Sequence, residues 1–223
     1  MIELPAFKTP ALLVTALSHR SSLNEKASGT TALESNERLE FLGDAVLELI
    51  VTQFLYDKFP AEPEGVLTAY RSALVKTTTL AEVARMLSLG DRLYLSKGEE
   101  STGGRNNDSL LADVMEAVIG ALFLDQGIEV VTEFLAEHLF VKFDEILQNK
   151  LYKDNKSQLQ EIVQAKGLVT PAYEVTKEVG PDHDKDFTVQ VTVDGRILGT
   201  GTGKSKQQAQ QQAAAEALIA LGA

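Results

Sequence analysis

The spacing of apolar residues changes once along this 223-residue chain, near residue 150. Up to that point apolar residues recur at three- and four-residue intervals, which is the repeat of amphipathic helices. No strand pattern of useful length interrupts this region, and its breaks fall at prolines and glycines. The sequence therefore predicts an all-α first domain with helices at 11–17, 37–56, 67–87, 109–125 and 129–147.

After a polar linker at 148–156, segments alternate apolar and polar residues, the two-residue period of half-buried strands. Asp194-Gly195 predicts a tight turn between two of them. The expected order is α-β-β-β-α, a small α+β domain with strands at 173–179, 187–193 and 196–199 between helices at 152–167 and 204–221. We expect the two domains to occupy residues 1–149 and 154–222.

The formal net charge of −11 at first argues against a nucleic-acid partner. The charge is uneven, however. Residues 1–151 hold 13 Lys and Arg against 23 Asp and Glu, whereas residues 152–223 hold 8 against 9. The excess acid therefore belongs to the first domain. The chain has no cysteine, which excludes disulfides, thiolate metal sites and cysteine nucleophiles.

The first 17 residues hold one acid, Glu3, and one base, Lys8, and are broken by Pro5 and Pro10, which is not the pattern of a signal peptide. No uninterrupted apolar run approaches the ~20 residues that a membrane span needs. We therefore expect a cytoplasmic protein with no membrane partner.

The stretch SNERLEFLGDAVLE, residues 35–48, concentrates acid on one side of a predicted helix. Its four acids fall within an arc of roughly 80° of the helix, and the stretch contains only one cation, Arg38. Like charges at this spacing cost a helix a few tenths of a kcal/mol each. The acids are Glu37, Glu40, Asp44 and Glu48, and the opposite, buried face is expected to hold Leu39, Leu42, Val46, Leu49 and Ile50.

A second acid pair, Asp113 and Glu116, lies three residues apart on an otherwise apolar helix, and Glu64 opens another helix. Acids in so apolar a helix are costly unless paired or bound to metal. Carboxylates converging from two helices without histidine form an all-oxygen site, which suits Mg²⁺ or Mn²⁺. A di-iron site needs Glu-x-x-His pairs, and the sequence has none. The alternative is that these acids are merely solvated, and for Glu48 that is our interpretation.

Four segments in order resemble bacterial ribonuclease III, and the resemblance covers nearly the whole chain. They are HRSSLNE at 19–25, ERLEFLGDAVL at 37–47, EGVLTAYRSALV at 64–75 and GGRNNDSLLADVMEAVIGALFLD at 103–125. The second domain resembles the double-stranded-RNA-binding domain of the same family. The resemblance implies an all-α endonuclease domain followed by an RNA-binding domain.

The resemblance further implies a homodimeric, Mg²⁺-dependent endonuclease that cuts double-stranded RNA, with Mn²⁺ able to substitute. Its products would carry 5′-phosphate and 3′-hydroxyl ends with short 3′ overhangs, and its roles would include processing of ribosomal precursors and messages. By position, the residues that would hold the metal are Glu40, Asp44, Asp113 and Glu116. Of these Glu116 would be closest to indispensable, with Glu37 and Glu64 as auxiliary acids lining the cleavage cleft.

Phe41 lies within the acidic arc, on the wrong side for its own core. An aromatic residue there is either an interdomain contact or an interface anchor, and the family's dimer contact favours the anchor. Cutting both strands needs two sites, which a twofold axis supplies. His19 invites a general-base role, but packing and hydrogen bonding near the end of the first helix is favoured, since metal-activated water needs no protein base.

Duplex RNA is recognised mostly by shape, through 2′-hydroxyls and phosphates. The second domain offers side chains for this on its first helix, in the loop GPDH and before its last helix: Gln160, Gln164, His183, Lys204, Ser205 and Lys206. Two departures from the family pattern weaken this set. The loop at 182–186 is acidic, and Gln207 follows where a second lysine is common. We therefore expect modest, salt-sensitive affinity for RNA.

Two other functions remain open at the level of sequence. A protein of the same architecture could hold structured RNA without cutting it, but it would have no use for six convergent carboxylates. A metal-dependent hydrolase of nucleotides or phosphate esters would explain the first domain and leave the second without purpose. Long duplex RNA with and without Mg²⁺ separates all three.

Overall fold

The computed structural model describes residues 4–23, 34–149, 152, 154–181 and 185–222. Its contacts divide the chain into two compact units, Met1–Tyr152 and Lys153–Ala223. Among the described residues no helix is long and apolar enough to cross a membrane.

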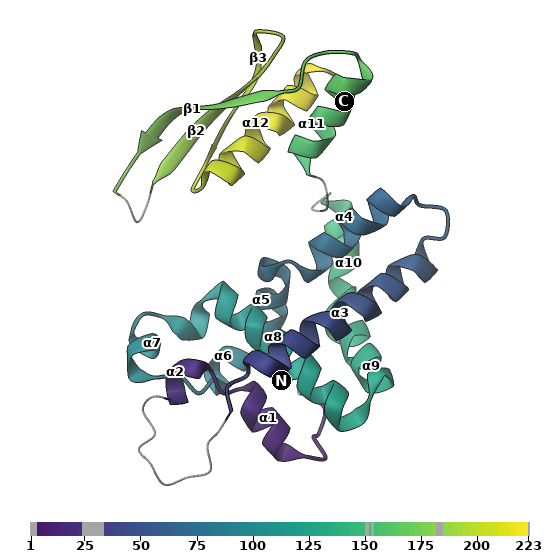
Figure 1. Ribbon diagram of the computed structural model, residues 1–223, viewed down its shortest axis with the longest axis vertical. Coiled ribbons are helices and arrows are strands. Elements are labelled where there is room, and N and C mark those ends of the chain that lie inside the picture. Colours follow the sequence, from purple (N-terminus) through teal and green to yellow (C-terminus); the bar gives the residue numbers. More distant parts are fainter. Residues whose placement is uncertain (1–3, 24–33, 150–151, 153, 182–184, 223) are drawn as a thin grey trace. The chain divides into compact units, whose positions relative to one another are not determined.

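The described part of the first unit is helical, as the spacing of its apolar residues predicts (Figure 1). Its only β-type pairing in the described ranges is an isolated bridge between Ser18 and Tyr94. The α-helices are α1 (Pro10–Ala16), α2 (Arg20–Leu23), α3 (Glu37–Lys58), α4 (Glu64–Val75), α5 (Thr77–Met86), α6 (Leu89–Arg92), α7 (Lys97–Ser101), α8 (Asp108–Gln126), α9 (Ile128–His138) and α10 (Phe143–Gln148), with 3₁₀ turns η1 (Gly104–Asn106) and η2 (Phe140–Lys142).

Two predicted helices are each divided in the structure. The segment 67–87 is broken at Lys76, whose extended backbone (ψ 148°) ends α4 and starts α5. The hydroxyl of Thr79 donates back to the carbonyl of Ala73 at 2.9 Å, which fixes the corner. The segment 129–147 is likewise divided into α9, η2 and α10. A three- and four-residue spacing persists across a sharp corner, so periodicity alone does not detect either break.

Helix α8 lies at the centre of the first unit, with α3 running across it (Figure 1). Two glycines permit the close approach. A Cβ on Gly43 would lie 1.8 Å from the carbonyl oxygen of Glu116, and one on Gly120 would lie 2.2 Å from that of Leu39. No side chain fits in such gaps, so the backbones of α3 and α8 touch at this crossing.

The predicted buried face of α3 needs one correction. Leu39, Val46 and Ile50 are buried, whereas Leu49 is 57% exposed. Leu49 lies about 100° around the helix from Ile50 and so falls outside the arc that faces α8. Leu47, fully buried, takes the place that the sequence pattern gave to Leu49.

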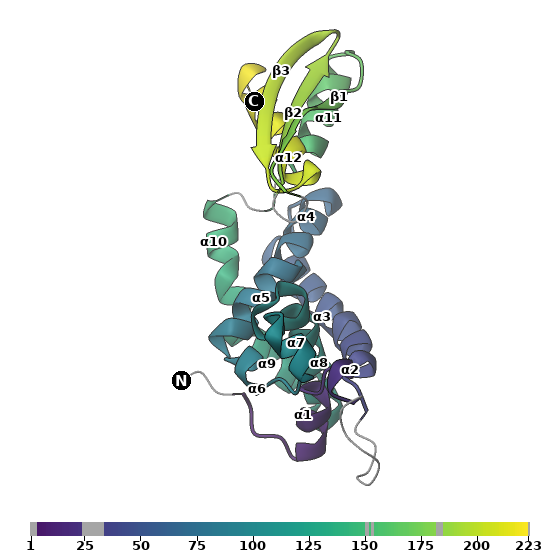
Figure 2. The same cartoon turned by 90° about the vertical axis from the view of Figure 1, so that its left-hand side faces the viewer.

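The second unit has the predicted α-β-β-β-α order. Its three strands form an antiparallel sheet in the order β1 (Ala172–Val179), β2 (Asp186–Val193), β3 (Arg196–Gly203). Helices α11 (Asn155–Ala165) and α12 (Lys206–Ala220) cover one face of this sheet (Figure 2). Their contact buries Leu159 and Val163 against Val189 and Val191.

Strand β3 runs four residues beyond its predicted end, to Gly203. Two of its glycines, one at the strand's predicted end and one beyond it, have a packing role. A Cβ on Gly199 or Gly201 would lie within 2.3 Å of the backbone of Ala213 on α12. The alanines of α12 and the glycines of β3 therefore let helix and strand approach closely.

Candidate active site

The α3–α8 crossing places four predicted metal ligands close together. Glu40 and Asp44 flank Gly43 on α3, while Asp113 and Glu116 lie on α8, within two turns of Gly120. The side chains of Glu40, Asp113 and Glu116 are half-buried and that of Asp44 is exposed. Because the glycines bring the two backbones into contact, the acids of one helix face those of the other.

The electrostatics of these acids show that they interact. Burial first, and then the negative charges of Asp44, Glu40, Asp113 and Glu48, raise the pKa of Glu116 to about 8. Burial also raises the pKa of Glu40, and the charge of Asp113 raises it further. The neighbouring carboxylates therefore add to the cost of ionising Glu116 and Glu40, and a bound cation would remove this cost.

The donor set fits a hard divalent cation. All four side chains supply oxygen, the ligand atom that Mg²⁺ and Mn²⁺ prefer. In the described part of the chain no three acidic or histidine side chains form a closed ligand cage. Holding a cation would therefore require changes of side-chain rotamer that bring the carboxylates together, and the charge of the cation would offset their mutual repulsion.

Two further predicted residues lie on opposite sides of this group. Glu37, in the first turn of α3, is 3.5 Å from Arg20 and contributes to the raised pKa of Glu40. Glu64, exposed at the start of α4, accepts a hydrogen bond from Thr68 at 3.1 Å. It lines a cavity of 410 Å³ rather than the acid group. Within one chain, Glu37 therefore belongs with the four acids and Glu64 does not.

Glu48 lies at the surface, as predicted, with its side chain 39% exposed, but it is not merely solvated. Its carboxylate is half-buried and pairs with Arg71 at 3.0 Å, across from α3 to α4. Arg71 also donates to the hydroxyl of Thr52 at 3.0 Å. Glu48 is close enough to Glu116 to raise the pKa of Glu116, so it acts as a peripheral member of the acid group.

His19 is held by a hydrogen-bond network beside the acids. Its Nδ1 lies 2.8 Å from the Ser21 hydroxyl. Burial raises the pKa of Asp113, and the charge of a protonated His19 would partly offset this rise. Arg20 acts on Asp113 in the same way. Sequence reasoning did not identify Arg20, or the glycines at positions 43 and 120, as parts of the site. The two glycines could have been noticed because each interrupts an otherwise helical pattern, which often marks a close packing contact.

In the second unit the predicted RNA contacts are exposed. Gln160 and Gln164 lie on α11, and Ser205 caps α12 by accepting from the amide of Gln208 at 3.2 Å. Lys204 and Lys206 are paired with acids in this structure: Lys204 lies 3.1 Å from Asp186 and Lys206 3.0 Å from Glu178. His183 lies outside the described residues.

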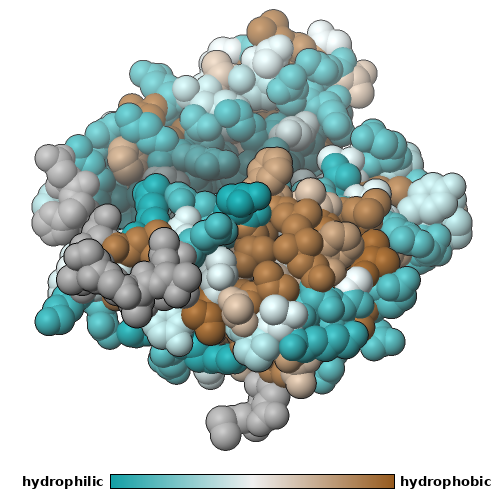
Figure 3. All heavy atoms as spheres, turned by 60° about the horizontal axis from the view of Figure 1, so that its bottom comes forward, coloured by the Kyte–Doolittle hydropathy of each residue, from teal (hydrophilic) through white to brown (hydrophobic). Residues whose placement is uncertain are grey.

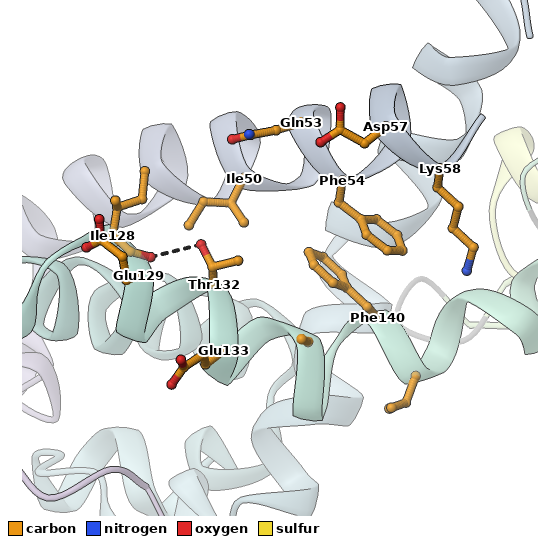
Figure 4. A pocket seen from close by; sticks show the side chains of 12 residues that line it. Ile50, Gln53, Phe54, Asp57, Lys58, Ile128, Glu129, Thr132, Glu133 and Phe140 are labelled. Carbon is orange, nitrogen blue, oxygen red and sulfur yellow. Dashed lines mark hydrogen bonds between the residues drawn. The ribbon is translucent and has the colours of Figure 1, made fainter. Parts of the chain in front are cut away.

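An apolar groove of 1030 Å³ lies between α3 and α9, and it contains none of the predicted catalytic acids. The rings of Phe54 and Phe140 stack within it at 3.9 Å, and Thr132 donates to the carbonyl of Ile128 (Figure 4). The presence of a large groove therefore does not by itself identify the active site of this chain.

Comparison with known proteins agrees with the fold. A ribonuclease-III-like family model matches residues 9–143, and a double-stranded RNA binding motif matches residues 155–221. The chain belongs to the ribonuclease III family. Ribonuclease 3 of Bacillus licheniformis is 49% identical over 215 residues, 96% of this chain and 85% of that protein. Ribonuclease 3 of Bacillus cereus is 50% identical over 96% of this chain and 86% of its own length.

Among solved structures, the nuclease domain of ribonuclease III from Campylobacter jejuni matches with a TM-score of 0.55 and 42% identity. The match covers 60% of this chain and 88% of that domain. The present chain is therefore an endoribonuclease of the bacterial ribonuclease III type that acts on double-stranded RNA.

The raised pKa of Glu116 predicts how the metal-free enzyme responds to pH. The folded protein keeps a proton on Glu116 up to a pKa of about 8, whereas the unfolded chain releases it near the ordinary value of 4.5. The folded state thus binds more protons between these values, and its stability falls as pH rises from 4.5 to 8. After discounting for solvent screening, this loss amounts to about 2 kcal/mol.

Urea unfolding in EDTA at pH 5.5 and 8.5 measures this effect. Wild type should lose about 2 kcal/mol more of its free energy of unfolding than Glu116→Gln, which has no proton to release. Glu137→Gln, on the exposed side of α9, serves as the matched control and should follow wild type. Equal losses in all three proteins would show that the pKa of Glu116 is not raised in the folded protein.

Proposed function

We propose that the chain cuts both strands of duplex RNA by Mg²⁺-dependent hydrolysis at the α3–α8 crossing. The observation that carries this proposal is the group of four carboxylates whose mutual repulsion and burial raise the pKa of Glu116 to about 8. Such a group is costly for a protein that only binds RNA, whose phosphates it would repel.

The residues have distinct roles in this proposal. Glu40, Asp44, Asp113 and Glu116 would hold the cation, with Mn²⁺ able to substitute. When bound, Mg²⁺ supplies an activated water and neutralises charge on the leaving oxygen. Asp44 and Glu116 would be the main catalytic acids, and Glu37 would be an auxiliary acid of the cleavage cleft. Glu64, which lies apart from them within one chain, would act as an auxiliary acid in the assembled enzyme.

A homodimer is part of the proposal. Phe41 is 82% exposed on α3, and the same helix exposes Leu49 and Tyr56 by 57% and 70%. Apolar side chains also gather in a patch on the face of the molecule that Figure 3 shows, with hydrophilic side chains around it, although the view does not assign the patch to these three residues. Patches of this kind mark interaction surfaces. The nuclease domain from Campylobacter jejuni is described as flexible in a region involved in its dimer formation, which supports a dimer here.

We further propose the finer features of the reaction. Cleavage leaves 5′-phosphate and 3′-hydroxyl ends with short 3′ overhangs, as the resemblance to ribonuclease III implies. A twofold axis would give each strand of the duplex its own site. The enzyme works in the cytoplasm, on ribosomal precursors and messages. Residues 1–149 form the catalytic domain and residues 154–222 the RNA-binding domain.

Long duplex RNA incubated with the full chain, in Mg²⁺ or in EDTA, tests the proposed function. We expect Mg²⁺-dependent conversion to short duplexes whose 5′ ends carry phosphate. Intact RNA retained by the protein in both conditions would instead indicate a binding protein. Hydrolysis of nucleotides without cleavage of RNA would indicate a phosphate-ester hydrolase.

The pairing of Lys204 and Lys206 with acids bears on RNA affinity. Phosphates must displace Asp186 and Glu178 from these lysines, so each contact is weaker than that of an unpaired lysine. If both lysines contact phosphate, Lys204→Ala plus Lys206→Ala lowers the slope of log affinity against log salt by about 1.8.

Filter binding from low to high salt measures the slope. Lys166→Ala plus Arg196→Ala is the matched control, since it removes two positive charges from the opposite end of the domain. An unchanged slope in the first variant would remove the start of α12 from the RNA-contact surface.

A further inference from the structure

A polar cavity of 660 Å³ adjoins the four acids without including any of them. One wall comes from the segment between α1 and α2, and the other from the region around the start of α8. The lining residues are His19, Arg20, Ser21, Leu23, Glu99, Asn107, Ser109 and Leu110. Asp113 lies one turn beyond Ser109 on α8, and the charges of His19 and Arg20 both act on it. The cavity therefore opens next to the reacting centre.

The backbone of the first wall is fixed. The amide of His19 donates to the carbonyl of Tyr94 at 3.1 Å, and the amide of Tyr94 donates to the carbonyl of Leu17 at 2.9 Å. This pairing is the one parallel bridge described in the first unit. Because both hydrogen bonds join segments far apart in the sequence, the wall holds its position without a ligand.

The same wall sets the tautomer of His19. The amide of Ser96 donates to the Ser21 hydroxyl at 3.0 Å, and that hydroxyl lies 2.8 Å from His19 Nδ1. The amide of Ser21 also donates to Nδ1, at 3.3 Å. An N–H can only donate, so Nδ1 accepts and the proton of the neutral ring is on Nε2. His19 is thereby left with a hydrogen-bond donor on the side away from Ser21.

The opposite wall also presents donors. The Asn107 side-chain oxygen accepts from the amides of Ser109 and Leu110 at 2.9 and 3.2 Å. This cap occupies the first amides of α8 and orients the Asn107 NH₂ group, whose two protons remain as donors. Ser109 adds a hydroxyl. The donors of this wall are thus side chains rather than the bare end of the helix.

Arg20 completes the set. Its guanidinium lies 3.5 Å from Glu37 and is 74% exposed, so this ion pair leaves several of its five N–H groups for another acceptor. Glu99 is the one carboxylate among the residues that line this cavity. A guanidinium, an oriented imidazole N–H, an amide and a hydroxyl around one cavity match the oxygens of a phosphate group.

We propose that this cavity binds a backbone phosphate of the RNA strand next to the phosphate that is cut, with Arg20 and His19 as its main contacts. The proposal rests on the proposed function, because it places the bound strand at the four acids. Positive charge beside the acid group would offset the repulsion between these acids and the phosphates of the RNA. The acids alone repel the substrate, whereas a neighbouring phosphate site would hold the strand in position for cleavage.

A set of short duplex RNAs tests this proposal, each with one uncharged methylphosphonate linkage at a different position. Binding is measured for two variants that should not cut: Glu116→Gln alone, and Glu116→Gln combined with Arg20→Gln. With Arg20 present, neutralising the contacted phosphate should weaken binding about tenfold. With Arg20→Gln, that position should show no extra loss, while the losses at other positions remain.

Matched controls make each outcome decisive. Arg92→Gln removes an exposed guanidinium on α6 and should leave the whole profile unchanged. Ser109→Ala should weaken the effect at the same linkage as Arg20→Gln. A profile that is identical with and without Arg20→Gln overturns the proposal. Cleavage of the unmodified duplex by the wild-type chain is measured in parallel, so a failure of the proposed function is seen separately from a failure of the phosphate site.

Discussion

Glu116→Gln is expected to lower the rate of duplex-RNA cleavage by at least about 100-fold while leaving RNA affinity unchanged. Glu116 lies at the centre of the acid group, since the charges of four other acids act on it. A neutral amide keeps the shape of the side chain but removes the charge that would hold the cation. The rate is measured under single-turnover conditions in saturating Mg²⁺, and affinity in EDTA.

Glu137→Gln is the control for this prediction. It makes the same chemical change on an exposed position of α9 and should cut RNA at the wild-type rate. A fully active Glu116→Gln enzyme would rule out our assignment of the site. Equal loss of cleavage and RNA binding would mean that the substitution disturbs the fold rather than the chemistry.

The second large effect is expected at Gly43. An alanine there would place its Cβ 1.8 Å from the carbonyl oxygen of Glu116, and that neighbour is backbone, which cannot rotate away. Gly43→Ala must therefore push α3 and α8 apart. We expect a loss of about 3 kcal/mol in the free energy of unfolding. Cleavage should also be lost, because the acids on the two helices separate.

Gly65→Ala is the matched control, since its added Cβ meets no atom within 4 Å. On α4 this substitution should be neutral or stabilising by up to about 1 kcal/mol. Urea unfolding of the two variants compares them directly. If Gly43→Ala and Gly65→Ala proved equally stable, the close crossing of α3 and α8 would be wrong.

The long helices were predictable from the sequence because each carries many turns of one pattern. Segments 37–56 and 109–125 correspond to α3 and α8 within two residues at either end. Their acids could also be identified, since charge is conspicuous on an apolar helix. The α-β-β-β-α order of the second unit followed from a change of period that no helix can produce.

The failures have a common physical cause, which is contact with distant segments. The corner at Lys76 and the exposure of Leu49 depend on what each helix packs against. The ion pair of Glu48 was not predicted because its partner, Arg71, lies on another helix. The continuation of β3 past Gly199 was not predicted, because it depends on the close approach of Gly199 and Gly201 to α12. Local patterns carry no information about such neighbours.

The candidate site divides in the same way. The four acids were evident by type and spacing, but the glycines that bring them together were not recognised as part of the site. Arg20 was also missed, because nothing in its own segment shows that Asp113 lies beside it. The pairing of Lys204 and Lys206 with acids of the sheet likewise becomes visible only when the strands are assembled.

Binding of a divalent cation by the acids at the α3–α8 crossing is the step on which the proposed function depends. Titration of Mn²⁺ into the full chain, with free Mn²⁺ followed by electron paramagnetic resonance, tests it most directly. We expect a saturable site in wild type and in the control Glu133→Gln plus Glu137→Gln on α9. Glu40→Gln plus Asp113→Asn should lose that site. Equal Mn²⁺ binding by all three proteins would contradict the proposed metal site.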